Sequence, residues 1–529
     1  MTRFYYSGLF LCLLFVWIGT VWCQDSLNVE KGYNLLEQGK FNLAADVFRD
    51  MVGKNPEDVD AWNGFAQAMD RAGNPPAALD AYQKSLKLNK SQPETWFLMG
   101  NLLYYGKNYA EAQAAYRNAV IYDPYHARAI NNLGNIYKQV GQTDEALERF
   151  RRAAELDPGY SLAFRNAGDI YFRKGDYKQA VEWLSKAVET DPDNLYGNYW
   201  LGRAYLKSGN LDKAKSQFLN VLTKRPNLPQ VHHDLGQVYF ALRQYGPAID
   251  HIKTAIGKNP ATLYYYVALS RIYLNLSNEN QSLAILRDAL KMDSTSAEIY
   301  IERGDIHKAA SRLEEALYAY VTATRYAPDS WKPYYKKGVA LYYLTRLDEA
   351  EQAFLMAYDL NSESASVCHF LGLNSLAKNR SQDARNYLTK AVALDSSDAD
   401  IWFHLGQAQM RDHKWEEAQR SLQKAYNLDN RHSQVLYNLG EVNKKLGNLD
   451  KARNYSRKFN NVSNFEREID SLKKKLSENP RDTSIRRELA VLYEKEGDLI
   501  KAAEYLQQAV YLGDVSALTK LSKWRGELN

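Results

Sequence analysis

The residue types that most often carry catalysis are scattered along this sequence. It contains no Gly-x-Ser-x-Gly turn for a nucleophilic serine, no glycine-rich phosphate loop and no Cys-x-x-Cys pair. His232 and His233 are neighbours on a predicted helix, so their side chains point in different directions and do not predict a shared metal ion. Cys368 occupies a position where other segments carry Trp62 or Trp402, which favours a small buried side chain over a nucleophile. We therefore expect no enzymatic activity, no cofactor and no metal site.

The distribution of charge excludes one class of partner. The chain has 68 basic and 63 acidic residues, so its formal net charge is only +5, and the excess is dispersed. Nucleic-acid binders need clustered Lys and Arg to displace the counterions of the phosphates, so we exclude nucleic acid as a partner. One basic run, Lys473 to Lys475, fits a solvated helix face better than a contact with anionic lipid.

Small residues recur along the chain with a period of 34, and they reveal the elements that position every other side chain. The recurring residues are Gly32, Ala66, Gly100, Gly134, Gly168, Gly202, Gly236, Ser270, Gly304, Gly338, Gly372, Gly406 and Gly440. An Ala follows twelve positions later in every repeat except one, where Ser282 replaces it. Thirteen repeats without insertion or deletion therefore occupy residues 25–466.

The pattern of each repeat predicts two helices, because apolar residues fall twice at i, i+3, i+4 and i+7. In the repeat 127–160, Gly141 lies between the helices, where a left-handed C-cap is needed, and Pro158 follows the second helix. In the next repeat, Asp176 with Gln179 three residues later predicts a capping box. The recurring Gly is expected where the two helices approach most closely.

A Gly, a Tyr, an Ala, an aromatic residue and a Pro at these fixed positions resemble the tetratricopeptide repeat. The string from Asn131 to Tyr137, Asn-Asn-Leu-Gly-Asn-Ile-Tyr, is similar to the repeats of O-linked N-acetylglucosamine transferases, although the catalytic half of those enzymes has no counterpart here. The resemblance implies an all-α, right-handed α-solenoid of stacked antiparallel helix pairs. It also implies a protein that binds other molecules without transforming them.

The regular period ends after residue 466. Residues 467–482 predict an extra amphipathic helix with a break or kink in the register, residues 483–516 one further repeat, and residues 517–529 a C-terminal capping helix. The repeat 263–296 is also unusual, since Ser270, Ser282 and Ser294 replace its Gly, Ala and Pro, and we predict a flexible joint there.

The N-terminal residues 1–23 predict an export signal. Arg3 precedes an uncharged stretch that contains the apolar run from Leu9 to Ile18. A cleaved signal, a retained membrane anchor and a lipidated Cys23 all remain open. Each of them places the repeats outside the cytoplasm, so we expect a periplasmic, extracellular or membrane-anchored protein.

Positions 2, 5, 9, 12 and 13 of each repeat share the face of the first helix that lies opposite its packed face. In tetratricopeptide folds this face lines a groove, which here is aromatic and basic. The candidate groove residues are Phe97, Asn101, Tyr105, Asn131, Asn135, Lys138, Arg165, Asp169, Phe172, Arg173, Tyr199, Arg203, Lys207, His233, Phe240, Tyr265 and Arg271. Arg beside aromatic rings is typical of binding hot spots, but tolerated solvent-facing residues give the same pattern.

Chaperone-binding members of the family hold a C-terminal carboxylate with Lys and Asn side chains from successive repeats. Asn135 and Asn166 match the two Asn positions, whereas Asn131, Tyr196 and Trp200 stand where the basic residues belong. The sequence therefore does not predict this clamp. We expect a scaffold outside the cytoplasm that binds other proteins or extended, acidic peptides in the groove. The alternative is a scaffold of a polysaccharide or glycan export or assembly machinery, because Tyr and Trp rings also stack on sugars.

Overall fold

The computed structural model describes residues 28–525, in which every regular element is a helix. The segment expected to direct export, residues 1–23, lies outside the described residues. Two compact units divide the chain, an N-terminal unit that ends at Val221 and a C-terminal unit that begins at Leu222. Among the described helices, none is both long enough and apolar enough to cross a membrane.

Two helices per repeat alternate along the described chain, as the periodicity predicts, and the expected all-α solenoid of helix pairs is confirmed. Residues 28–37 are helical and form the first helix of the first repeat. The other first helices are α3 (Val59–Arg71), α5 (Pro93–Tyr105), α7 (Ala127–Gln139), α9 (Ser161–Arg173), α11 (Leu195–Lys207), α13 (Pro229–Ala241), α15 (Leu263–Asn275), α17 (Ala297–Ala309), α19 (Trp331–Tyr343), α21 (Ala365–Ala377), α23 (Ala399–Arg411), α25 (Ser433–Lys445) and α27 (Thr483–Lys495). The second helices are α2 (Phe41–Lys54), α4 (Pro75–Leu88), α6 (Tyr109–Tyr122), α8 (Thr143–Leu156), α10 (Tyr177–Thr190), α12 (Leu211–Lys224), α14 (Tyr245–Lys258), α16 (Glu279–Met292), α18 (Leu313–Tyr326), α20 (Leu347–Leu360), α22 (Ser381–Leu394), α24 (Trp415–Leu428), α26 (Leu449–Glu478) and α28 (Leu499–Tyr511). The last helix is α29 (Val515–Arg525).

The recurring glycine lies at the closest contact between the two helices of its repeat. A Cβ atom on Gly134 would lie 2.7 Å from the Phe150 ring, and one on Gly168 would lie 2.6 Å from Cγ of Leu184. Both partners are fully buried. The expected close approach is thus confirmed, and a glycine is needed because any side chain would overlap the partner.

The turn between the two helices uses a left-handed residue. Gly141 has φ +80°, as the sequence predicts for a C-cap. Asp176 caps α10 by accepting a hydrogen bond of 3.1 Å from the backbone N–H of Gln179. The second half of the predicted capping box does not form, because the Gln179 amide donates to Glu182 and the Asp176 N–H donates to the carbonyl of Tyr171.

The serines of the repeat 263–296 do not open its core. The Ser270 and Ser282 hydroxyls are buried and lie 2.7 Å apart, and Ser282 also donates a hydrogen bond of 2.9 Å to the Ser270 carbonyl. Buried hydroxyls need such partners. The pair therefore replaces the Gly–Ala contact of the other repeats with a hydrogen-bonded one.

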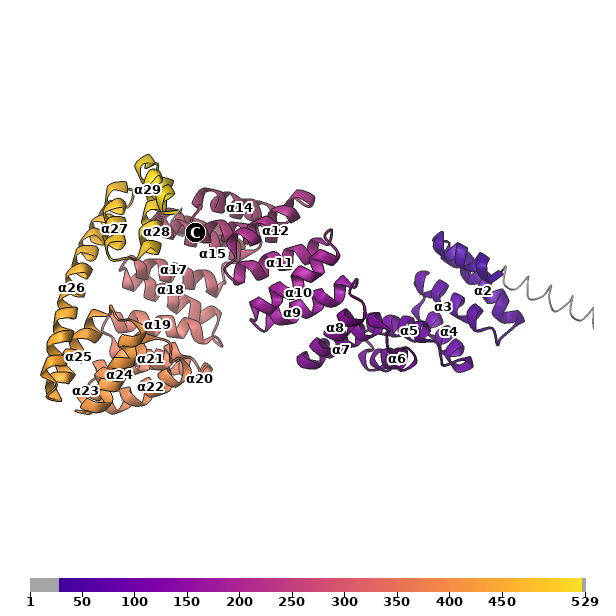
Figure 1. Cartoon of the computed structure of the whole chain (residues 1–529), viewed down its shortest axis with the longest axis horizontal. Helices are drawn as coiled ribbons and strands as arrows, with labels where there is room; N and C mark the ends of the chain where they lie inside the picture. Colours follow the sequence, from indigo (N-terminus) through magenta and orange to yellow (C-terminus); the bar gives the residue numbers. More distant parts are fainter. Residues whose placement is uncertain (1–27, 526–529) are drawn as a thin grey trace, which may run out of the picture. The chain divides into compact units, whose positions relative to one another are not determined.

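The expected separate helix at residues 467–482 is wrong. One continuous helix, α26, runs for 30 residues from Leu449 to Glu478, and Figure 1 shows it between α25 and α27. The sequence from Leu449 to Glu478 contains neither Gly nor Pro, so nothing in it ends a helix before Pro480. Ile469 and Leu476 are buried against the repeat that follows.

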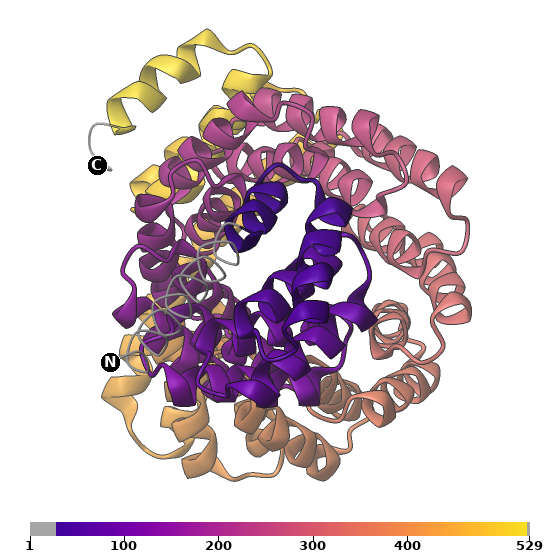
Figure 2. The same cartoon turned by 90° about the vertical axis from the view of Figure 1, so that its right-hand side faces the viewer.

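The last helices of the C-terminal unit contact the first helices of the same unit. In Figure 2 its helices follow one continuous curve from the pink to the orange part of the chain. The turn after α13 and the first residue of α14 then meet α28: the guanidinium of Arg243 contacts Glu504, and the rings of Tyr245 and Tyr511 pack edge to face. We call this contact the seam.

Candidate partner-binding face

The groove residues predicted from the sequence fall in both units, and each set is described within its own unit. Those from Phe97 to Lys207 lie on α5, α7, α9 and α11 of the N-terminal unit, and we call this surface the first-helix face. His233, Phe240, Tyr265 and Arg271 belong to α13 and α15 of the C-terminal unit. Exposure differs strongly within the set, because the residues occupy different positions of the repeat.

Four of the predicted groove residues are buried and do not form a free surface. Phe97, Asn131, His233 and Tyr265 are between 1% and 7% exposed. Phe97, Asn131 and His233 occupy position 5, and Tyr265 occupies position 3. A helical wheel makes position 5 look free, but consecutive first helices also contact each other, and position 5 lies in that contact.

The exposed members of the set occupy positions 9 and 13 of the repeat. Tyr105, Arg173, Lys207 and Arg271 are exposed, and Tyr105 has 83% of its surface accessible. The half-buried members are Asn101, Asn135, Lys138, Arg165, Asp169, Phe172, Tyr199, Arg203 and Phe240. Position 5 is thus buried at Phe97, Asn131 and His233 but only half-buried at Arg165 and Tyr199.

Asparagines join the first helices of successive repeats. Asn166 donates hydrogen bonds of 2.9 Å to Asn131 and 3.4 Å to Asn135. Asn132 donates one of 2.8 Å to Asn101, which also accepts a hydrogen bond from the Tyr116 hydroxyl. These amides are engaged in holding neighbouring repeats together. Asn135 and Asn166, the two residues that match the chaperone clamp, thus bind each other.

Three charged residues form a bridge across α7 and α9. The Asp169 carboxylate lies 3.4 Å from Nζ of Lys138 and 3.1 Å from Nε of Arg173. The Asp169 side chain is only 15% exposed, whereas that of Arg173 is 69% exposed. One carboxylate therefore serves two cations, and this part of the face keeps a net positive charge.

Arginines lie over aromatic rings on α9 and α11. The guanidinium carbon of Arg165 is 5.1 Å from the ring centre of Tyr196, and that of Arg203 is 4.7 Å from Trp200 and 5.3 Å from Phe172. Phe172 and Trp200 also pack edge to face at 5.3 Å. Stacking on Tyr196 orients the Arg165 guanidinium while leaving its N–H groups able to donate to an anion. We call these five residues the arginine–aromatic cluster.

Position 2 contributes residues to this surface that the predicted set omits. Tyr196 is 53% exposed, and Arg128 lies 4.9 Å above the Phe97 ring while it contacts Glu94 at 2.9 Å. A hydrogen bond from His126, together with nearby Arg128, lowers the pKa of Glu94. The sequence could have identified Tyr196 and Arg128, since position 2 is one of the positions predicted to lie opposite the packed face of the first helix.

A cleft of about 620 Å³ lies at one end of the first-helix face, between α3, α4 and α5. Asn101 and Tyr105, both predicted groove residues, line it together with Asp70 and Arg71. Burial raises the pKa of the Asp70 carboxyl, and neighbouring Arg71 opposes this effect. The cleft presents hydrogen-bonding side chains beside the exposed ring of Tyr105.

In the C-terminal unit the predicted residues are largely engaged with each other. The His233 ring bonds to Asp234 at 2.9 Å and to Gln237 at 3.1 Å, and it packs on Tyr265. Arg271 forms an ion pair with Glu302, which raises the pKa of the guanidinium. His232 instead contacts His251 at 2.9 Å, so the two adjacent histidines do point in different directions.

Sequence comparison identifies the repeats. Models described as tetratricopeptide repeat match residues 29–93, 93–126, 127–160, 199–261, 263–296, 297–365, 371–426, 405–457 and 488–512. A model described as TPR repeat matches residues 168–209. Together they cover well over half of the chain.

Two curated plant proteins match a short part of the chain. The Hsp70-Hsp90 organizing protein 3 of Arabidopsis thaliana is 22% identical over 113 residues, which are 21% of this chain and 20% of the relative. The Hsp70-Hsp90 organizing protein 1 of Glycine max is 23% identical over 113 residues, with the same coverage. The chain thus spans about a fifth of the length of these relatives.

Solved structures are similar at low identity. The APC/C hetero-tetramer Cut9-Hcn1 matches 93% of this chain and 94% of its own, with 16% identity and a TM-score of 0.38. YrrB, described as a TPR protein with an unusual peptide-binding site, matches 36% of this chain and 98% of its own, with 24% identity and a TM-score of 0.34.

Proposed function

Because the chain belongs to the tetratricopeptide repeat family, whose members are protein-interaction scaffolds, we propose a specific scaffold function for it. The protein is a non-catalytic scaffold outside the cytoplasm. Its first-helix face, on α5, α7, α9 and α11, binds an extended acidic segment of a partner protein. The proposal rests on the arginine–aromatic cluster, and three features of the face support it.

The first feature is an arginine that the protein itself leaves available. Among the described residues no carboxylate lies within ion-pair distance of Arg165, which bonds only to the amide oxygen of Asn166 and stacks on Tyr196. A guanidinium held in place but not neutralised can bind a carboxylate through two parallel hydrogen bonds.

The second feature is the sign of the charge. The predicted residues of the face include five cations and one carboxylate, namely Lys138, Arg165, Arg173, Arg203, Lys207 and Asp169. Such an excess attracts an acidic partner and makes binding sensitive to salt, since exposed charges are screened beyond about 8 Å at physiological ionic strength.

The third feature is the rigidity of the support. The Asn131–Asn166 and Asn101–Asn132 hydrogen bonds fix the spacing of successive first helices. An extended segment gains affinity from such a surface, because little side-chain entropy is lost when it binds.

Location outside the cytoplasm is proposed from the sequence of residues 1–23, where Arg3 precedes the apolar run from Leu9 to Ile18. Expression of the full chain with a C-terminal tag tests it. Protease added to intact cells, or release of the periplasm, should reach the tag. Protection of the tag in intact cells and spheroplasts would exclude the proposed location.

A glycan is the alternative ligand, and exposed rings favour it. Tyr105 and Tyr196 are 83% and 53% exposed, and flat rings of this kind stack on sugars. Sugar stacking depends little on salt, whereas binding of an acidic peptide depends on it strongly. The two ligands can therefore be separated in one experiment.

The experiment measures binding of purified chain to a poly-glutamate peptide and to a neutral polysaccharide at low and high salt. We expect saturable, salt-sensitive peptide binding that the double variant Arg165→Ala with Arg203→Ala weakens by about tenfold or more. The matched control is Arg151→Ala with Arg152→Ala, which removes two exposed arginines of α8. Polysaccharide binding that is insensitive to salt, with no peptide binding, would contradict the proposal in favour of the glycan.

A further inference from the structure

The repeat formed by α27 and α28 lacks a neighbour that the other repeats of the C-terminal unit possess. From α15 to α25, each first helix contacts the first helix before it. Among the described helices, α25 and α27 form no contact of this extent. The reason is the length of α26, which has 30 residues where α24 has 14 and therefore carries the chain about 24 Å further.

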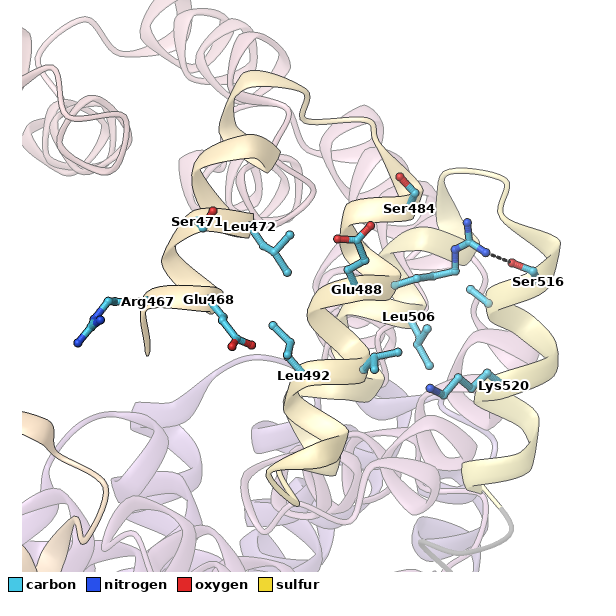
Figure 3. Close-up of a pocket in the computed structure, with 13 residues that line it drawn as sticks. Arg467, Glu468, Ser471, Leu472, Ser484, Glu488, Leu492, Leu506, Ser516 and Lys520 are labelled. Carbon is cyan, nitrogen blue, oxygen red and sulfur yellow. Dashed lines mark hydrogen bonds between the residues drawn. The ribbon is translucent and has the colours of Figure 1, made fainter. Parts of the chain in front are cut away.

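A cleft of about 910 Å³ remains where that neighbour would pack (Figure 3). Residues of the C-terminal half of α26, of α27 and of α29 line this cleft. On α27 the lining residues are Ser484, Arg487, Glu488, Val491 and Leu492. Their spacing of i, i+3, i+4, i+7 and i+8 is the stripe that a helix presents to another helix.

The bottom of the cleft is apolar. Leu472 of α26 and Leu492 of α27 face each other across it, and Leu506 of α28 lies between α27 and α29 (Figure 3). Val491, which also lines the cleft, is 49% exposed. Val491 and Leu492 therefore offer apolar surface on a regular helix that a docked helix can cover.

The charged residues at the rim of the cleft determine which charge a bound segment should carry. Arg487 is paired with Asp514 at 3.1 Å, and Lys520 contacts Glu494 at 2.5 Å. Glu468 and Glu488 have no ion-pair partner within residues 28–525, and the Glu468 side chain points into the cleft from α26 (Figure 3). Against these two carboxylates the described rim has one cation without an ion pair, Arg467, so a net negative charge remains that a bound basic segment can neutralise.

We propose that this cleft is a second docking site, which binds a basic amphipathic helix of a partner protein in the place of the missing first helix. Its apolar stripe covers Leu472, Val491 and Leu492, and its Lys or Arg side chains contact Glu468 and Glu488. The site is separate from the first-helix face and has the opposite preference for charge. It does not depend on the function proposed for that face.

The test uses a synthetic helical peptide of about 14 residues, built of Ala with one stripe of Leu flanked by Lys, and a second peptide with Glu in place of Lys. Fluorescence anisotropy with the full chain should show saturable binding of the Lys peptide. Binding of the Glu peptide should be at least about tenfold weaker.

Two variants assign the binding to the cleft. Val491→Arg adds bulk and positive charge at an exposed position, and Glu468→Lys with Glu488→Lys inverts the rim; each should weaken binding of the Lys peptide by about tenfold or more. The matched controls are Val140→Arg, at a site 56% exposed, and Glu145→Lys with Glu148→Lys on α8. Circular dichroism verifies that all variants keep their helix content.

Three outcomes would overturn the proposal. Equal binding of both peptides would mean general adhesion to an apolar surface, and binding unchanged by Val491→Arg would place the peptide elsewhere. A dimer in light scattering that Val491→Arg dissociates would assign the cleft to a second copy of the chain. Loss of the arginine–aromatic cluster should leave this binding unchanged, so failure of one proposal is distinguishable from failure of the other.

Discussion

Arg243 and Glu504 are 261 positions apart in the sequence and are joined by two hydrogen bonds of 2.8 and 3.0 Å. Their side chains are 30% and 23% exposed, and Asn275 also donates to Glu504. Arg243 has a left-handed backbone with φ +59°, which a residue other than glycine rarely adopts. Gly141 adopts the same left-handed turn at this repeat position, so the specificity of the seam rests on the paired side chains.

Breaking this pair should loosen the end of the C-terminal unit. Arg243→Glu places like charges in the half-buried seam, and we expect a loss of about 1 to 3 kcal/mol in the local stability of α28. Hydrogen exchange of the α28 amides should become faster. The charge-swapped double variant Arg243→Glu with Glu504→Arg should slow their exchange again. Arg49→Glu, which breaks an exposed pair with Asp46, is the control and should change little.

Acid should destabilise the contact between α21 and α23. Burial, reinforced by the neighbouring His404, lowers the pKa of His369 from 6.5 to about 4. Nε2 of His369 lies 3.0 Å from Nδ1 of His404, and Asp398 and Asp400 oppose the lowering of the His369 pKa. Between pH 6.5 and 4 the unfolded chain binds the extra proton, so stability is present above pH 6.5 and is lost as the pH falls, by up to about 3 kcal/mol.

Denaturant titration of the full chain across this pH range measures the effect. His369→Asn with His404→Asn should remove this part of the pH dependence, because Asn131 and Asn166 already form the equivalent hydrogen bond at the same spacing in the N-terminal unit. An unchanged pH dependence in the double variant would contradict the assignment.

The recurring glycine is expected to be required at Gly168 but not at Gly440. In Gly168→Ala the new methyl group would meet Leu184 at 2.6 Å, so we expect overpacking to cost about 1 to 3 kcal/mol. At Gly440 the nearest atom is Ser456 Oγ at 3.5 Å, and Gly440→Ala should stabilise α25 by up to about 1 kcal/mol. Thermal denaturation of both variants is the measurement, and equal effects would contradict the steric explanation.

Arg486 is fully buried at position 4 of its repeat, where other repeats carry Trp or Cys. Its Nη1 donates to the carbonyl of Asp482 and its Nε to Gln508, but Nη2 has no hydrogen-bond partner within the described chain. Burial lowers the pKa of this guanidinium. Arg486→Met should therefore be neutral or stabilising, by up to about 4 kcal/mol.

Chemical denaturation compares this variant with Arg486→Ala, which leaves a cavity and should cost about 2 to 4 kcal/mol. A large loss of stability in Arg486→Met would show that the charge itself is needed in the fold.

The helices and their closest contacts were predictable because they depend on residues near one another in the sequence. The period of 34 locates Gly134 and Gly168, and local sterics alone require glycine there. The sequence from 449 to 478 contains neither Gly nor Pro, which is the pattern of one continuous helix α26. The change of register after residue 466 suggested a break instead.

The face and the seam were less predictable for a different physical reason. Burial of Phe97 and Asn131 results from contact between successive repeats, which the periodicity of a single helix does not contain. The pairing of Arg243 with Glu504 depends on the curvature accumulated over many repeats. No local pattern in the sequence indicates which two distant residues that curvature brings together.

Helix α26 belongs to two hairpins at once. Its first half packs against α25 and its second half against α27, and no turn separates the two halves. Elsewhere in the chain, adjacent hairpins are joined by turns and can lose their structure one at a time under load. When the C-terminal unit is stretched in a single-molecule experiment, the hairpins that share α26 should therefore extend in one larger step.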